Sequence, residues 1–268
     1  MSGASDPSPK NGGPEKKTSG GLLSDLRVIW NLVAHRGRGN THQERLESFY
    51  SGQAGDYDAF RKRLLQGRER MLEAAAQAEG EQTGGTWIDI GGGTGHNVEA
   101  AGEETLARFD RVIILDLTPS LLEVARQRIE ARGWTNVTTL LADATAFELP
   151  PDTPPVRRIS FSYSLTMIPD WFAALDRGLE LLQPGGHAGI VDFYVARKYP
   201  ETGLVQHGWW TRIGWPAWFA SDNVFLNPDH VPYLRRRLTT VTLEERRAKV
   251  PYLPLVRVPY YVFVGRKG

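Results

Sequence analysis

A glycine-rich stretch directly after an apolar run constrains this chain more than any other part of it. Residues 87–90 read Trp-Ile-Asp-Ile and are followed by Gly91, Gly93 and Gly95, after which a helical pattern begins at His96. Glycine permits a sharp turn and a close approach of the backbone to a ligand, because it has no Cβ atom. A buried strand, a glycine loop and a helix in this order predict an α/β fold with a nucleotide-type cofactor at the loop.

The residue after the third glycine helps to decide which cofactor is bound. A dinucleotide-binding loop has Gly or Ala at the position of His96, which weakens the interpretation as an NAD-dependent oxidoreductase. The order acidic-x-Gly-x-Gly-x-Gly, from Asp89 to Gly95, resembles the class I S-adenosylmethionine-dependent methyltransferases. The resemblance implies S-adenosyl-L-methionine as cofactor, with Asp89 and the three loop glycines among its binding residues. A glycine turn without any ligand is the alternative.

Two carboxylates further along the chain fit the same cofactor. Residues 111–116 form a second apolar run that ends at Asp116. An acidic residue about 20 positions beyond such a loop accepts the ribose hydroxyls in open α/β sheets. The next apolar run is followed by Asp143, for which the resemblance implies a contact with the adenine amino group. Either carboxylate also suits a helix cap or a turn. Leu117 and Ala144, which adjoin them, complete the predicted cofactor residues on this side.

Alternating apolar runs and helical patterns predict the rest of the fold. Further strands are expected at residues 137–141, 156–163 and 188–194, helices at 96–108 and 170–183, and a turn at Pro184-Gly185-Gly186. Residues 238–248 and 256–265 are expected to form an antiparallel hairpin. With right-handed crossovers, this order predicts a doubly wound, mostly parallel seven-stranded sheet, Rossmann-like as in the class I methyltransferases.

A change in composition separates three regions of the 268-residue chain. Residues 1–20 are rich in Ser, Gly, Pro and Lys and are predicted to be a disordered tail. Residues 21–80 are predicted to form a helical segment that covers the site, and residues 81–268 to form the methyltransferase core. Within the core, the alternation fails over 198–237, an insertion that holds four of the eight tryptophans.

Composition and charge exclude several classes of protein. The chain has no cysteine, so disulfide scaffolds and cysteine-ligated metal sites are excluded, and no metal site is predicted. A net charge of +1 gives no general attraction to nucleic acid. No apolar run approaches the length of a transmembrane helix, and the first 20 residues lack the apolar core of a signal peptide. We therefore expect a cytoplasmic protein, of undetermined oligomeric state.

Two segments suggest peripheral contact with a membrane surface. Residues 22–33 place leucines, Ile29, Trp30 and Val33 on one helical face, and arginines follow at positions 36 and 38. Such a stripe packs on its own domain or lies in a membrane interface. The tryptophans of the insertion, at positions 209, 210, 215 and 218, form either a satellite core or an exposed greasy surface.

Several outer segments resemble one family in particular, the betaine-lipid methyltransferases. These segments are Glu47-Ser48-Phe49-Tyr50, residues 57–61, Tyr163 to Pro169, Val191 to Tyr194, and Asp222 to Leu226. The resemblance runs from about residue 41 to the end. It implies an N-methyltransferase that methylates the lipid headgroup amine of diacylglycerylhomoserine three times, giving diacylglyceryl-trimethylhomoserine. Another lipid or a quinone as acceptor, and a non-catalytic lipid-binding module, stay open as alternatives.

The expected product predicts aromatic residues at the acceptor site. A trimethylammonium group has no N–H, so cation–π contacts dominate its recognition. Tyr163, Tyr50 and Tyr194 are the candidate catalytic residues, and Tyr57 is a candidate for the cofactor lid. Buried tyrosines also serve as packing residues with one wet end. His96 is a candidate for relaying a proton or, alternatively, for orienting the start of its helix.

Overall fold

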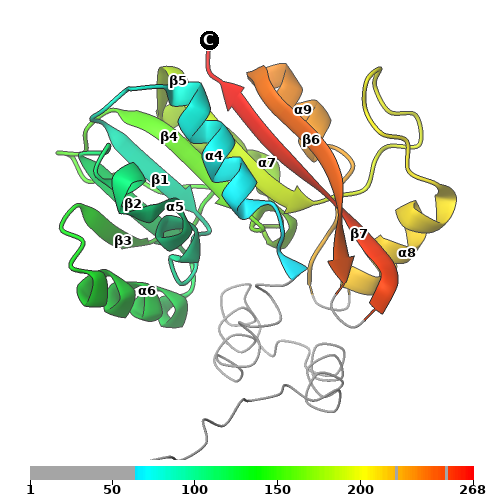
Figure 1. Ribbon diagram of the computed structural model, residues 1–268, viewed down its shortest axis with the longest axis horizontal. Coiled ribbons are helices and arrows are strands. Elements are labelled where there is room, and N and C mark those ends of the chain that lie inside the picture. The colour runs from blue at the N-terminus through cyan, green and yellow to red at the C-terminus, as the bar shows by residue number, and fades with distance from the viewer. Residues whose placement is uncertain (1–63, 221–222, 251–252) are drawn as a thin grey trace, which may run out of the picture.

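The structure is a computed structural model that describes residues 64–220, 223–250 and 253–268 (Figure 1). The predictions for residues 1–63 therefore lie outside the described residues. They include the tail, the apolar stripe over 22–33, and the roles of Tyr50 and Tyr57.

Seven strands and six α-helices make up the described part. The strands are β1 Thr86–Ile90, β2 Arg111–Asp116, β3 Val137–Leu141, β4 Val156–Ser162, β5 Leu182–Phe193, β6 Thr239–Val250 and β7 Leu253–Arg266. The helices are α4 Arg68–Glu79, α5 His96–Leu106, α6 Pro119–Arg132, α7 Trp171–Leu181, α8 Trp209–Ala220 and α9 His230–Arg237, with a 3₁₀ turn, η1, at Leu165–Met167.

All seven strands form one sheet in the order β3-β2-β1-β4-β5-β7-β6. Strands β1 to β5 pair in parallel, whereas β7 pairs antiparallel with both β5 and β6. The predicted seven-stranded, mostly parallel sheet with a C-terminal antiparallel hairpin is confirmed. The carboxyl ends of the five parallel strands consequently meet at one edge, where ligands bind in folds of this class.

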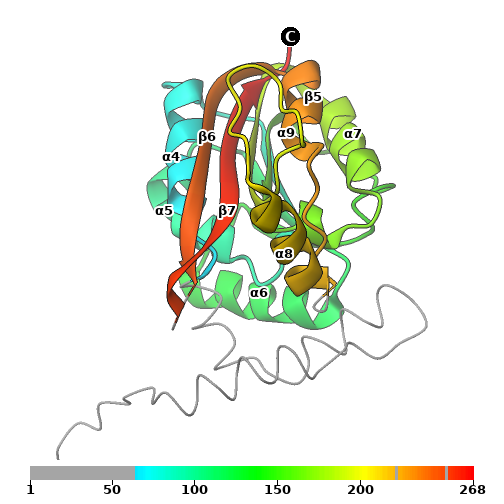
Figure 2. The same ribbon diagram turned by 90° about the vertical axis from the view of Figure 1, so that its right-hand side faces the viewer.

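The central parallel strands β1, β2, β4 and β5 bury both of their faces, because helices cover both sides of the sheet (Figure 2). The edge strand β3 is partly exposed. On β2, Val112 and Ile114 belong to the core shared with α4, α5 and α6, whereas Ile113 and Leu115 face the core shared with α7 and α9. Alternate residues of a strand point to opposite faces. This explains why the strand reads as an unbroken apolar run in the sequence.

The segment Pro184-Gly185-Gly186, predicted as a turn, lies within β5, at an irregularity where the residues paired with β4 shift from Leu182 to His187. Helix α7 ends at Leu181, and β5 begins at the next residue and includes the Pro-Gly-Gly segment. Gly185 has φ +77°, and its N–H donates to the carbonyl of Lys267 at 2.9 Å, while the N–H of Lys267 donates to the carbonyl of Gly186 at 2.9 Å. Pairing with the C-terminal residues therefore extends the strand through a sequence typical of a turn. The predicted strand over 188–194 thus begins six residues earlier, at Leu182, and ends at Phe193.

The tryptophan-bearing insertion, residues 198–237, contains two helices, α8 and α9, and α8 packs at the carboxyl end of β5. The ring of Phe219 on α8 lies 5.0 Å from that of Phe193, centroid to centroid. Beyond the helix, the N–H of Phe225 donates to the carbonyl of Thr166 at 2.7 Å. The insertion thereby borders the edge at which the cofactor loop lies.

Candidate active site

The glycine loop lies between β1 and α5, as predicted, and its glycines have left-handed backbone conformations. Their φ angles are +69° at Gly91, +56° at Gly93 and +74° at Gly95. A Cβ atom on Gly91 would lie 2.5 Å from the Cβ of Ser164, and one on Gly95 would lie 2.8 Å from Cδ1 of Ile114. Two of the three glycines are therefore required by packing within the protein, in addition to any approach of a ligand.

A fourth glycine, Gly92, depends on the buried carboxylate of Asp89. A Cβ atom on Gly92 would lie 2.8 Å from Oδ2 of Asp89. Oδ1 of Asp89 accepts hydrogen bonds from Asn97 Nδ2 at 2.7 Å and from Ser160 Oγ at 2.6 Å. Burial raises the pKa of Asp89 to about 6, against the opposing effect of these two hydrogen bonds. Asp89 thus holds the base of the loop, and its predicted contact with the cofactor stays a prediction.

Asp116 lies directly beside the loop. It is 9% exposed, and its Oδ2 accepts a hydrogen bond from the N–H of Gly93 at 2.8 Å, while Oδ1 accepts one from the N–H of Thr118 at 2.9 Å. A carboxylate oxygen has room for more than one hydrogen bond. The geometry therefore fits a ribose whose hydroxyls meet Asp116 next to the loop glycines.

The segment that holds Asp143 reaches the same edge. The N–H of Ala142 donates to the carbonyl of Asp116 at 3.1 Å, which joins the ends of β2 and β3. Oδ1 of Asp143 accepts hydrogen bonds from the N–H and the hydroxyl of Thr145, each at 2.8 Å. Ala144 is buried and Leu117 is half-buried. Asp143 thus forms the turn that the alternative interpretation expected, and its contact with adenine stays a prediction.

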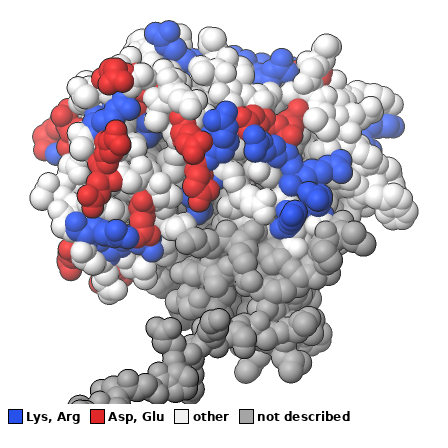
Figure 3. Space-filling model, in the orientation of Figure 1, with Lys and Arg blue, Asp and Glu red and all other residues white. Residues whose placement is uncertain are grey.

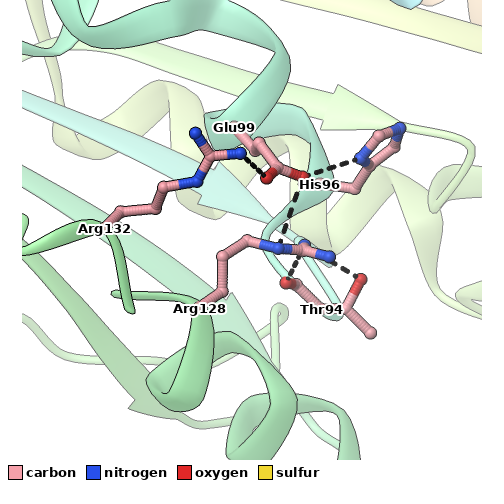
Figure 4. A network of polar contacts seen from close by, with 5 residues as sticks. All are labelled: Thr94, His96, Glu99, Arg128 and Arg132. Carbon is pink, nitrogen blue, oxygen red and sulfur yellow. Dashed lines mark hydrogen bonds and ion pairs between the residues drawn. The ribbon is translucent and has the colours of Figure 1, made fainter. Parts of the chain in front are cut away.

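A polar network joins the loop to α5 and α6 (Figure 4). Arg128 donates a hydrogen bond to the carbonyl of Thr94, and its Nε lies 3.4 Å from Oε2 of Glu99. Arg132 lies 2.6 Å from Glu99, and Nδ1 of His96 lies 3.5 Å from Oε2 of the same carboxylate. Burial is the main cause that lowers the pKa of His96. The network fixes the first turn of α5, which agrees with an orienting role for His96.

Both described tyrosines from the predicted catalytic set lie at the carboxyl ends of central strands. Tyr163 follows β4 with φ +55°, its ring centroid lies 4.7 Å from that of Phe193, and its hydroxyl donates to the carbonyl of Gln66. Tyr194 follows β5, and its hydroxyl donates to Glu245. Both side chains are buried with partnered hydroxyls. Their contact with an acceptor stays a prediction.

Asp192, for which the sequence predicts no role, lies at the same edge. Asp192 is fully buried and accepts hydrogen bonds from the hydroxyl of Thr166 at 2.7 Å and from its N–H at 3.2 Å. Burial raises the pKa of this carboxyl to about 7. Both residues lie in segments that carry the family resemblance, which is the signal that could have pointed to them. Its oxygens accept hydrogen bonds from Thr166 and from the N–H of Phe193, so the carboxyl is held in place at this edge.

Solved structures with a similar fold include S-adenosylmethionine-dependent enzymes. Phosphoethanolamine N-methyltransferase 2 of Haemonchus contortus, solved with S-adenosyl-L-methionine, aligns with a TM-score of 0.63 at 16% identity over 85% of this chain and 60% of that one. The N-methyltransferase NodS of Bradyrhizobium japonicum aligns with a TM-score of 0.53 at 15% identity over 79% of this chain and 98% of that one. At this identity the likeness establishes the fold.

Sequence comparison identifies the family. The model of the ubiE/COQ5 methyltransferase family matches residues 39–201. The ubiquinone/menaquinone biosynthesis C-methyltransferase of Hydrogenovibrio crunogenus is 25% identical over 152 residues, and that of Idiomarina loihiensis is 28% identical over 156 residues. The matches cover 56% and 58% of this chain, and 59% and 61% of the relatives' lengths. With the glycine loop beside Asp116, these findings show that this chain belongs to the ubiE/COQ5 methyltransferase family and is an enzyme that uses S-adenosyl-L-methionine.

Proposed function

We propose that this methyltransferase acts on the amine headgroup of a membrane lipid, with diacylglycerylhomoserine as the first candidate and three successive methyl transfers. One observation carries the proposal: the segments that resemble the betaine-lipid enzymes, far apart in sequence, meet at one edge of the sheet. Tyr163 contacts Phe193 at 4.7 Å between ring centroids, Thr166 binds Asp192 at 2.7 Å, and Phe225 binds Thr166 at 2.7 Å. This edge adjoins the cofactor loop, where Ser164 Oγ donates to the carbonyl of Ile90 at 3.0 Å.

The groups at this edge suit transfer to an amine. When bound, S-adenosyl-L-methionine supplies the methyl group as part of a sulfonium cation. Only a deprotonated amine has the lone pair that attacks, so a proton must leave in each round. In this proposal the carboxylate of Asp192, which is held in place by Thr166, accepts the proton that the amine loses. The rings of Tyr163 and Phe193 provide an aromatic environment compatible with a cationic headgroup.

A quinone-type acceptor is the second candidate, and a specific observation favours it. Both relatives compared above are named as ubiquinone/menaquinone biosynthesis C-methyltransferases. Methylation of a ring carbon replaces its hydrogen by the methyl group: a deprotonated ring hydroxyl supplies the electron density for attack, and loss of the proton from the methylated carbon then restores the aromatic ring and the hydroxyl. Asp192 would accept that proton in the same way. The two candidate functions therefore differ in the methyl acceptor that binds at this edge of the sheet, and they share the same cofactor.

A direct competition between acceptors tests the proposal. The full chain is incubated with methyl-deuterated S-adenosyl-L-methionine and vesicles that contain either diacylglycerylhomoserine or a prenylated quinol, and the extracted lipids are analysed by mass spectrometry. We expect the homoserine lipid to gain one, two and finally three labelled methyl groups. Label in the quinol alone would replace the first candidate by the second. Asp116→Ala serves as the variant that should label neither acceptor.

A further inference from the structure

Helix α8 presents an apolar face to solvent. Trp210 is 80% exposed, Trp209 57% and Ile213 50%. The other exposed residues within the helix are all apolar: Gly214, Ala217, Trp218 and Ala220. A helix on the surface of a globular protein normally places its polar residues outward, so this arrangement is reversed. Contiguous exposed apolar surface of this kind marks a site of interaction.

The opposite face of α8 packs on the candidate active site. Phe219 is buried and lies 5.0 Å from Phe193 between ring centroids, and Phe193 in turn lies 4.7 Å from Tyr163. Trp215 packs beside Phe219 at 5.7 Å. Figures 1 and 2 both place α8 at the end of the sheet to which β5 points. A surface that binds the outer face of α8 therefore lies close to the acceptor edge.

Basic residues outnumber acidic ones beside this face, where Glu245 contacts the segment before α8 and Glu244 forms an ion pair of 2.7 Å with Arg246. Residues 203–220 contain no acidic residue, and residues 246–257, which include the tip of the β6–β7 hairpin, contain four cations and no acidic residue. The four cations, all exposed, are Arg246, Arg247, Lys249 and Arg257. In Figure 3, Lys and Arg gather over the hairpin, next to a mainly uncharged surface on the side of α8. The N–H of Val205, four residues before α8, donates to Oε2 of Glu245 on β6 at 2.9 Å, so the segment that leads into α8 adjoins the hairpin.

We propose that α8 docks this enzyme on an anionic membrane surface. Trp209, Trp210 and Ile213 enter the interface between headgroups and acyl chains, and the cations of the β6–β7 hairpin bind the anionic headgroups. Tryptophan favours this interface because its ring is large and apolar while its N–H stays near water. Basic residues next to an apolar face add electrostatic attraction to anionic lipid. In the described part of the chain no helix has the length and apolar character of a membrane span.

Vesicle binding by the full chain tests this proposal without cofactor or acceptor. Co-sedimentation is measured with phosphatidylcholine vesicles, with and without phosphatidylglycerol. We expect wild type to bind the anionic vesicles and the variant Trp209→Ser/Trp210→Ser to bind at least about 10-fold more weakly, because two interfacial rings are lost. Val241→Ser is the control, since Val241 is a 47% exposed apolar residue near the opposite end of β6. It should bind as wild type does.

The charge contribution is tested separately. Arg247→Gln and Lys249→Gln should each weaken binding to anionic vesicles by about fivefold, as expected for one basic residue near an anionic surface. Neither should change binding to pure phosphatidylcholine. Added salt should reduce the difference between the two kinds of vesicle, because it screens exposed charges.

Several outcomes would overturn the proposal. These are no binding by wild type, equal binding by the tryptophan variant, or loss of binding only when residues 1–38 are deleted. A change in oligomeric mass with unchanged vesicle binding would show that the face contacts another protein chain. Circular dichroism and calorimetric titration with S-adenosyl-L-methionine check that the variants fold. A short-chain acceptor in detergent separates docking from the proposed function, because its methylation should be unaffected by the tryptophan substitutions.

Discussion

At the scale of single residues, the loop glycines are required for different reasons. Gly91, Gly92 and Gly95 have protein atoms where a Cβ atom would lie, from Ser164, Asp89 and Ile114 respectively. Gly93 has no such neighbour within 3.4 Å, but it has φ +56° and donates its N–H to Asp116. The position most closely tied to the cofactor is therefore Gly93, together with the carboxylate that it binds.

The first prediction concerns Asp116. Asp116→Ala should weaken binding of S-adenosyl-L-methionine by roughly 2 to 4 kcal/mol, because charge-assisted hydrogen bonds to the ribose and to the N–H of Gly93 are lost. Calorimetric titration measures the affinity, and circular dichroism checks the fold. Unchanged affinity in a folded variant would contradict the assignment.

The second prediction concerns Gly93. Gly93→Val should abolish measurable cofactor binding, because a β-branched residue resists the left-handed conformation and its side chain lies beside Asp116. Gly133→Val is the matched control, since Gly133 ends α6 with φ +66° and has no atom within 4 Å of its would-be Cβ. That variant should lose about 1 to 3 kcal/mol of stability from backbone strain and keep its cofactor affinity. If both variants bound S-adenosyl-L-methionine with equal affinity, the glycine loop would not be part of the cofactor site.

At the scale of elements, the strands that the sequence predicted correctly are those marked by a continuous run of apolar residues. Residues 111–116 form β2 as expected, and the hairpin was placed to within a few residues. The sequence did not predict that Pro184-Gly185-Gly186 belongs to a strand. Its local composition is typical of a turn, and its pairing with Lys267 is a long-range contact. The hydrogen bond between Thr166 and Asp192 was not predicted either, because it joins two segments that are distant in the sequence.

The third prediction concerns the attachment of α4 to the sheet. Glu79 on α4 and Arg158 on β4 form two hydrogen bonds of 2.6 Å, and both side chains are buried. Glu79→Gln should destabilise the fold by about 3 to 5 kcal/mol, because the guanidinium is left buried without its counter-charge. Urea unfolding measures the change. The double variant Glu79→Leu/Arg158→Met should recover most of the loss, and a double variant less stable than Glu79→Gln would contradict this account.

At the scale of the whole molecule, different strands of the sheet carry the residues predicted to bind the cofactor and those predicted to bind the acceptor. Strands β1 to β3 present the glycine loop, Asp116 and Asp143, whereas β4 and β5 present the aromatic edge against which α8 packs (Figure 1).

A buried histidine, His230, lies in the core on the α7 side of the sheet. Its ring centroid is 4.7 Å from that of Trp171 and 6.2 Å from that of Tyr261, and within the described residues neither ring nitrogen has a hydrogen-bond partner.

The fourth prediction is a pH dependence of stability that His230 causes. Burial lowers its pKa to about 3, whereas in the unfolded chain the value is about 6.5. As the pH falls below about 6.5, only the unfolded chain takes up this proton, so stability is lost towards about pH 3. At about pH 5 the loss is about 2 kcal/mol relative to pH 7.5. Denaturant unfolding of wild type and His230→Phe at both pH values should show this difference between the two proteins, and parallel curves would contradict it.

The position of β7 has a consequence for how the protein forms during translation. Strand β7 is the last element of the described chain, yet it lies between β5 and β6 in the sheet. While the ribosome is still adding these residues, β6 has no neighbour to pair with, and β5 has one open edge. Tyr261 and Phe263, which belong to the core on the α7 side, arrive with the same strand. The cofactor half can therefore assemble as the chain emerges, but the acceptor half closes only when synthesis of this strand is complete.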